Sequence, residues 1–195
     1  METATKEAIA LRVLAEYWQT DVAPMVNPRA CVLAGRLATV VLGRIGISTA
    51  VYHTDTVAMN DLWYNLFIVK GLGQQFLPPE AWCVGAVTAD VKGTHSTMVG
   101  GFSGHLVVTT PHHFVDLSAS QFDRPSHDIV TGSPLIVPRE NITDTPHGKM
   151  VPIQRGVYIT KPAENPASYQ WTPDWQTNYK TFAKPLITRL REMFS

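Results

Sequence analysis

The sequence predicts an α+β fold, in which helices pack on an antiparallel sheet. Three observations support this prediction. Up to about residue 45, apolar side chains recur at the spacing of amphipathic helices. From about residue 47 to residue 116, the pattern changes to short β-branched runs separated by glycine and proline. Prolines then become frequent and exclude long helices until a final helical segment that begins near residue 172.

Composition narrows the class of protein. With 195 residues, 45% of them hydrophobic, the chain can build one substantial core, so we expect a single domain over residues 1–195. Sixteen basic residues balance sixteen acidic ones, and we expect neither nucleic acid nor a membrane surface as a partner. Two cysteines are too few for a disulfide framework, and the N-terminus lacks the apolar run of a signal peptide. We therefore expect a protein of the reducing cytoplasm.

Residues 3–22 are expected to form the first helix. The side chains that would face the core recur four residues apart, and they are Ile9, Val13 and Tyr17 together with Leu14 and Trp18. Pro24 closes this segment, because proline cannot continue a helix. We expect the helix to pack on the core.

Residues 27–46 carry start and stop signals of a second helix. Asn27 can be the N-cap and Pro28 the first helical residue, which places Cys31 in the first turn. The expected apolar stripe consists of Leu33, Leu37, Val40, Val41 and Ile45. Gly46 followed by Ile47 fits a left-handed cap with a hydrophobic closing contact.

Cys31 is the first candidate for chemistry. A thiol beside the free N–H groups of a helix terminus has its thiolate form favoured, and thiolate is the form that attacks carbonyl carbons. The same N–H groups can stabilise the oxyanion that such an attack produces. The alternative is that Cys31 is a small buried hydrophobe. One turn later, Gly35 either permits close approach of another element or simply eases helix packing.

Between residues 47 and 70 we expect one strand and one short helix. Residues 47–57 are rich in β-branched side chains and read as a strand. His53 lies on this strand, where an ordinary half-buried role is more common than ligand binding. Residues 60–70 have the spacing of a short helix, which Gly71 and Gly73 would end.

The next segment contains the second cysteine. Residues 81–91 predict a strand that holds Cys83 between Trp82 and Val84, so this thiol looks structural. Residues 92–104 contain four glycines and several small polar residues, which predicts a mobile loop.

Residues 104–116, GHLVVTTPHHFVD, predict a β-hairpin with proline in its turn. With Thr110 and Pro111 as central turn residues, the opposed pairs are Thr109 with His112, Val107 with Phe114, and His105 with Asp116. Opposed residues share a face with Cβ atoms about 4.5 to 5.5 Å apart, so a carboxylate could accept the imidazole N–H and set its tautomer. A four-residue loop keeps this pairing and a three-residue loop does not. A purely structural hydrogen bond between His105 and Asp116 is the alternative.

The proline-rich half has fewer signals. Residues 135–137 and 156–160 can form short extended pieces. Thr172 and Pro173 can cap a final helical segment, in which Pro185 should cause a kink or a restart. The apolar side chains of this segment predict packing on the core, and they are Trp175, Tyr179, Phe182, Leu186, Ile187, Leu190 and Phe194.

The chain order Cys31, His105, Asp116, with GH before the hairpin and FVDLSASQF at its end, resembles the transglutaminase-like group of papain-fold cysteine enzymes, which includes the arylamine N-acetyltransferases. The resemblance covers residues 27–125 as a catalytic core, with residues 126–195 as a proline-rich extension and a C-terminal helix. It implies a cysteine at the start of a helix packed on an antiparallel sheet. It also implies that Cys31 is the nucleophile, His105 the general base and acid, and Asp116 the residue that orients His105.

These residues predict cysteine-dependent acyl chemistry, either hydrolysis or acyl transfer through an acyl-cysteine. The expected substrate is a peptide, a protein or a small amide or acyl compound, and no cofactor or metal is needed. One alternative is a catalytically inactive binding or scaffold protein with this fold. Another is a metal site formed by Cys31 with histidines, although their spacing matches no standard zinc pattern; these histidines are His95, His105, His112 and His113.

Overall fold

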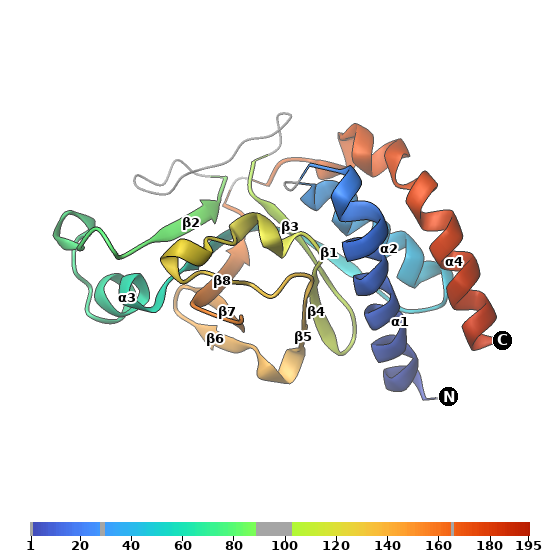
Figure 1. Ribbon diagram of the computed structural model, residues 1–195, viewed down its shortest axis with the longest axis horizontal. Helices are drawn as coiled ribbons and strands as arrows, with labels where there is room; N and C mark the ends of the chain where they lie inside the picture. Colours follow the sequence, from blue (N-terminus) through green and yellow to red (C-terminus); the bar gives the residue numbers. More distant parts are fainter. Residues whose placement is uncertain (1, 28–29, 89–102, 165) are drawn as a thin grey trace.

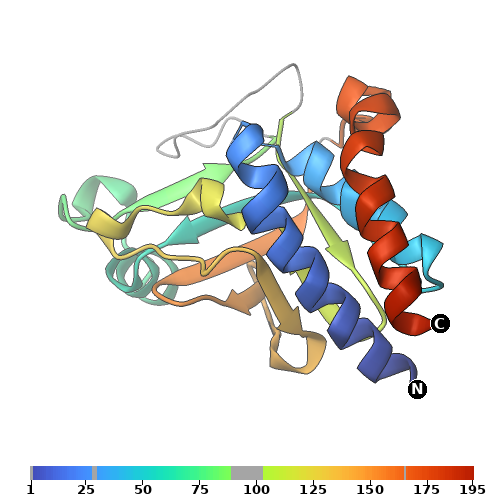
Figure 2. The same cartoon turned by 45° about the vertical axis from the view of Figure 1, so that its right-hand side comes forward.

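The protein has an α+β fold, as predicted, with a curled antiparallel sheet and several helices (Figures 1 and 2). The computed structural model describes residues 2–27, 30–88, 103–164 and 166–195. Three longer helices gather on one side of the sheet, and both chain ends lie on that side. The α-helices are α1 (Thr3–Tyr17), α2 (Cys31–Arg44), α3 (Asp61–Trp63) and α4 (Lys180–Phe194).

The described strands form one sheet in the order β5-β4-β3-β1-β8-β7-β6, and β2 also pairs with β1. They are β1 (Ala50–Met59), β2 (Cys83–Ala86), β3 (His105–Thr109), β4 (His113–Asp116), β5 (Leu135–Pro138), β6 (Thr143–Thr145), β7 (Gly148–Pro152) and β8 (Val157–Pro162). β3 and β2 pair with successive halves of one edge of β1, while β8 pairs with the other edge. This central strand therefore brings β3 close to β8, which lies some fifty residues later in the chain.

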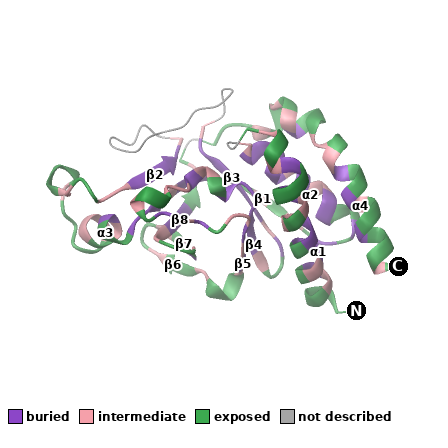
Figure 3. Ribbon diagram, in the orientation of Figure 1, coloured by how far each residue is buried: buried purple, intermediate pink, exposed green. Residues whose placement is uncertain are grey.

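Each face of the sheet packs against its own hydrophobic cluster, because side chains alternate along a strand. On β3, Val108 faces the cluster formed with α1, α2 and α4, whereas Val107 faces the inner cluster with Phe114, Phe122 and Tyr158. Figure 3 shows buried residues along both the strands and the inward faces of the helices. His105 has the same parity as Val107, so it belongs to the inner face.

The second helix has Cys31 in its first turn, as predicted, but its predicted cap is wrong. Ala30 is the N-cap, and its carbonyl accepts the first helical hydrogen bond, from Ala34 N at 2.9 Å. Asn27 instead closes a preceding turn, in which its carbonyl accepts from Ala30 N at 3.0 Å. Pro28, predicted as the first helical residue, lies outside the described residues.

The other end of α2 confirms the predicted left-handed cap. Gly46 has a φ of 82°, and Ile47 N donates to Leu42 O at 3.0 Å. Within the helix, Gly35 faces β3, where an added Cβ would lie 3.7 Å from Leu106 Cβ. Because this distance is an ordinary van der Waals contact, the packing of α2 on the strand that carries His105 does not require a glycine.

The β3–β4 hairpin exists, but its predicted register is wrong by two residues. Thr110 N donates to His113 O at 2.9 Å, so Pro111 and His112 are the central turn residues. Thr109 therefore pairs with Phe114 rather than with His112. The physical reason is that proline favours the first central position of such turns and is disfavoured at the second. A shift of two residues preserves the faces, so His105 and Asp116 still share one.

Several other predicted elements are confirmed with changed bounds. The first helix continues through a π-helical turn at Trp18–Val22 and a 3-10 turn at Ala23–Met25. α3 continues as a π-helix at Tyr64–Val69. β5 and β8 lie at the two extended pieces predicted in the proline-rich half, whereas the β6–β7 hairpin between them was not predicted.

The C-terminal helical segment starts with a π-helical turn at Asp174–Asn178 and continues as α4. α4 is one continuous helix that contains Pro185, so a restart there is wrong. Packing of Ala183, Leu186 and Leu190 into the cluster with α1 and α2 outweighs one lost backbone hydrogen bond.

Within the described ranges, none of the helices is both long and apolar enough to cross a membrane. The glycine-rich segment predicted as a loop falls largely outside the described residues.

Candidate active site

Cys31 lies at the start of α2, where that helix meets the beginning of β3. Its side chain is buried and packs with Val32, Leu106 and Trp175. The first intrahelical hydrogen bond comes from Ala34, so the N–H groups of the three residues before it precede the helical ladder. Since His105 is the first residue of β3, the contact between helix and strand brings both side chains to the same end of the sheet.

His105 and Asp116 form a direct, fully buried pair. His105 Nε2 lies 2.7 Å from Asp116 Oδ2, and both side chains have 0% exposure. Because a carboxylate only accepts, Nε2 carries the proton and Nδ1 remains as the other functional ring atom. The pair is diagonal across the hairpin rather than directly opposed, since the observed register continues to Val107 opposite Asp116. A diagonal contact is within the reach of a histidine side chain.

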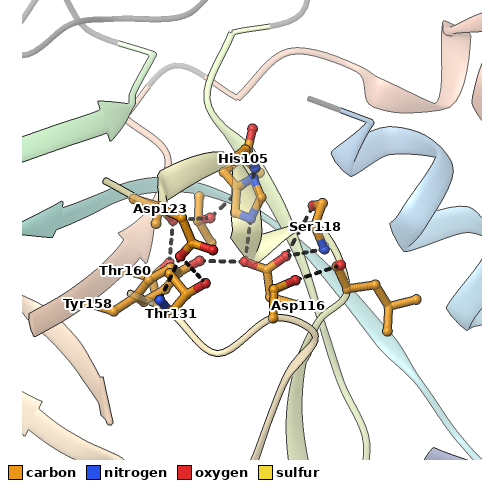
Figure 4. A network of polar contacts seen from close by, with 12 residues as sticks. His105, Asp116, Ser118, Asp123, Thr131, Tyr158 and Thr160 are labelled. Atoms are coloured by element: carbon orange, nitrogen blue, oxygen red, sulfur yellow. Dashed lines mark hydrogen bonds and ion pairs between the residues drawn. The ribbon is translucent and has the colours of Figure 1, made fainter. Parts of the chain in front are cut away.

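Two further residues hold the Asp116 carboxylate. Ser118 donates to Oδ1 from its backbone N at 3.0 Å and from its hydroxyl at 3.1 Å. Tyr158 on β8 donates its hydroxyl to Oδ2 at 2.7 Å. Figure 4 shows Asp116 between these partners, with His105 on the neighbouring strand. Asp116 therefore accepts four hydrogen bonds from the described residues, which fixes both the carboxylate and the ring that it contacts.

Electrostatics favour protonated His105 in this setting. Burial lowers the pKa of His105, but the charge of Asp116 and its hydrogen bond, followed by the hydrogen bond to Cys31, raise that pKa to about 10. Burial and the charge of Asp116 raise the pKa of Tyr158 well above its usual value, so its hydroxyl remains a donor. The arrangement suits an imidazole that takes a proton and is stabilised as imidazolium.

Gln121 and Phe122 complete the surroundings of the His105 ring. Gln121 Nε2 lies 2.8 Å from His105 Nδ1, and the Phe122 ring packs edge-on at 5.1 Å between centroids. Both belong to the 3-10 helix Ala119–Phe122, which follows β4. Both residues belong to the FVDLSASQF motif that carries the family resemblance, which implied no role for them. Gln121 and Phe122 could have been predicted as site residues from their closeness to Asp116 along the chain. Nothing in the sequence pointed to Tyr158.

The second cysteine and the strand histidine lie elsewhere. Cys83 is buried beside Met59 and Trp63, and burial raises the pKa of its thiol to about 11. It therefore has the structural character expected of it. His53 is buried on β1, where Nε2 lies 2.7 Å from the Ser103 carbonyl oxygen.

The described histidines of the alternative metal site lie apart, at the two ends of the hairpin. His112 and His113 lie at the turn end of the hairpin, away from His105 at its other end, and Glu7 accepts from His113 Nδ1 at 2.7 Å. Among the residues that the structure describes, no group of three or more metal-binding side chains is placed to hold an ion. His95 lies outside the described residues.

Comparison of the chain with protein-family models, with curated proteins and with solved structures found no match. The geometry of the site is therefore the observation that bears on function. It brings together Cys31, His105 and Asp116, the three predicted site residues, from α2, β3 and β4.

Proposed function

We propose that the protein is a cysteine-dependent enzyme of acyl chemistry, an amide or thioester hydrolase or an acyltransferase. The observation that carries the proposal is the buried pair of His105 with Asp116, beside the Cys31 thiol, which interacts with the same imidazole. A thiol at a helix N-terminus, a buried imidazole and a carboxylate that fixes its tautomer are the three roles of a nucleophilic triad. The arrangement also supports a transglutaminase-like core of the papain fold, which we propose for residues 27–125.

The chemistry follows from the placement of each group. Because Nε2 is hydrogen-bonded to Asp116, Nδ1 accepts the thiol proton of Cys31. The thiolate attacks the carbonyl carbon of an amide, ester or thioester, and N–H groups at the start of α2 stabilise the resulting oxyanion. His105 then gives its proton to the leaving group, and an acyl-cysteine remains. Water or an amine attacks the acyl group, His105 removes the proton of that nucleophile, and the thiol is regenerated.

Selective alkylation tests the proposed nucleophile. We expect limiting iodoacetamide to label Cys31 much faster than Cys83 near neutral pH, because His105 can accept the thiol proton of Cys31, whereas the pKa of the Cys83 thiol is raised to about 11. Mass mapping of the two peptides across pH measures both rates in one sample, so Cys83 is the internal control. In His105→Ala, we expect the Cys31 rate to fall at neutral pH, since the thiol loses its base.

An acyl probe tests the chemistry beyond thiol reactivity. With p-nitrophenyl acetate, we expect a burst of one nitrophenolate per chain and a mass increase of one acetyl group on Cys31. Cys31→Ala should abolish both, and Cys83→Ala should preserve both. Equal labelling of the two cysteines together with no acyl intermediate would contradict the proposal and favour a binding or scaffold protein.

A further inference from the structure

The side-chain amide of Gln121 meets the ring atom that the proposed chemistry uses. Its Nε2 lies 2.8 Å from His105 Nδ1, the same nitrogen that would exchange a proton with Cys31. Asp116 already occupies the other ring nitrogen at 2.7 Å. His105 is thus held at both nitrogens by side chains of one short segment.

The position of Gln121 is set by contacts that also build the site. Its backbone N donates to Ser118 O at 3.1 Å, and Ser118 itself donates twice to Asp116. On the other side of Gln121, Phe122 is buried against the rings of His105 and Tyr158. Arg124 donates to Gln121 O at 3.1 Å. These contacts fix the backbone of Gln121 relative to the imidazole, so the amide is not a chance neighbour of the ring.

A primary amide can serve both protonation states of an imidazole. Neutral His105 has one lone pair at Nδ1, which accepts from the Gln121 NH₂ group until Nδ1 takes a proton from Cys31 or from the attacking water or amine. Protonated His105 has an N–H there, which needs an acceptor, and a half-turn of the same amide presents Oε1. During the acyl-cysteine stage, the Cys31 sulfur is bonded to the acyl group and no longer offers or takes a proton. Among the described residues, the side chain of Gln121 then still forms a hydrogen bond to the Nδ1 edge of the ring.

We propose that Gln121 is a positioning residue that holds the Nδ1 edge of His105 in both protonation states, above all while Cys31 is acylated. The inference rests on the proposed function, since positioning of Nδ1 matters only if this atom transfers protons. Without the amide, the ring loses a hydrogen bond on the side where the attacking water or amine must be deprotonated. Gln121 would therefore act mainly on the second half of the reaction.

Burst kinetics with p-nitrophenyl acetate separate the two halves. For Gln121→Met, which keeps side-chain length without hydrogen bonding, we expect a steady-state rate up to about 100-fold lower, because small misplacements of catalytic groups cost that much. The burst rate should change by less than about threefold. Gln176→Met is the matched control, because Gln176 is exposed and donates to the Gln170 carbonyl oxygen, and it should leave both phases unchanged. Equal slowing of both phases, or a faster burst, would overturn the inference.

A carboxylate at this position tests the dual role. Gln121→Glu can only accept near neutral pH, so it stabilises imidazolium and should shift the pH dependence of deacylation upward. An unchanged profile in the folded variant would count against positioning.

A readout without substrate keeps this inference separable from the proposed function. In NMR titrations, the side-chain amide signals of Gln121 should change at the pH where His105 titrates, because the amide reverses. Gln121 side-chain amide signals that stay constant while His105 titrates would overturn the inference. If the signals follow that titration but the wild-type protein forms no acyl-enzyme, the proposed function fails while the contact between Gln121 and His105 stands.

Discussion

Replacing Asp116 with Asn should convert His105 to the wrong tautomer while keeping the fold. Ser118 N–H can only donate, so the Asn oxygen must take the place of Oδ1. The NH₂ group then replaces Oδ2, where it faces His105 Nε2 and the Tyr158 hydroxyl. Since this group donates, Nε2 must accept, and the ring proton moves to Nδ1. A protonated Nδ1 on a neutral ring cannot take the thiol proton of Cys31.

The expected loss is large. In a triad whose aspartate becomes asparagine, the wrong tautomer lowers kcat by about 10⁴. Here a loss of 10³- to 10⁴-fold corresponds to about 4 to 5.5 kcal/mol of transition-state stabilisation, at 1.36 kcal/mol for each factor of ten. The pKa of His105, raised to about 10, should fall in the variant because the carboxylate that favours imidazolium is gone. Two buried hydrogen bonds to Oδ1 persist, so the variant should fold.

Three measurements check this result. The burst and steady-state rates with p-nitrophenyl acetate report the chemistry, and the alkylation rate of Cys31 reports thiol activation. Nitrogen chemical shifts of His105 report the tautomer directly. Tyr158→Phe is the matched control, because it removes one donor to Oδ2 without changing the tautomer. It should cost no more than about tenfold, since one hydrogen bond contributes about 1 kcal/mol.

The reasoning would be refuted if folded Asp116→Asn kept its Cys31 alkylation rate, or if His105 retained the proton on Nε2. Equal losses of steady-state rate in Asp116→Asn and Tyr158→Phe would also contradict this prediction, because only Asp116→Asn should change the tautomer of His105.

The remaining predictions concern stability. Gly35→Ala should raise the free energy of unfolding by about 0.5 to 1 kcal/mol, because alanine favours helix and its Cβ meets Leu106 Cβ at an ordinary 3.7 Å; a lower urea midpoint would contradict this packing. Glu7→Gln should lower it by about 1 to 3 kcal/mol, because buried Glu7 accepts from Thr110 and His113. Burial raises the pKa of Glu7, but the hydrogen bonds from His113 and Thr110 lower it by more. The net result is a pKa below the usual 4.5. This stabilisation is therefore present above about pH 4.5 and is lost as pH falls through the lowered pKa of Glu7. A difference in free energy of unfolding between the wild-type protein and Glu7→Gln that grows on acidification would refute this.

Local patterns in the sequence determined the elements that carry the site. The left-handed cap at Gly46 and the place of Cys31 in the first helical turn depend on residues within a few positions of each other, and both were predicted. The common face of His105 and Asp116 was also predictable, because strand parity survives a register shift of two residues. The register itself was mispredicted, since Pro111 prefers the first central turn position.

Only the tertiary structure decided which distant side chains complete the site. Tyr158 reaches Asp116 because β8 pairs with β1, and no local pattern specifies which strands pair across more than forty residues. The role of Gln121 depends on a side-chain direction that follows from packing of Phe122 against the inner cluster. The left-handed helix cap and strand parity are set by short-range sterics and hydrogen bonds, which the sequence determines by itself. Strand pairing and side-chain convergence depend on the burial of the whole core, which only the folded chain resolves.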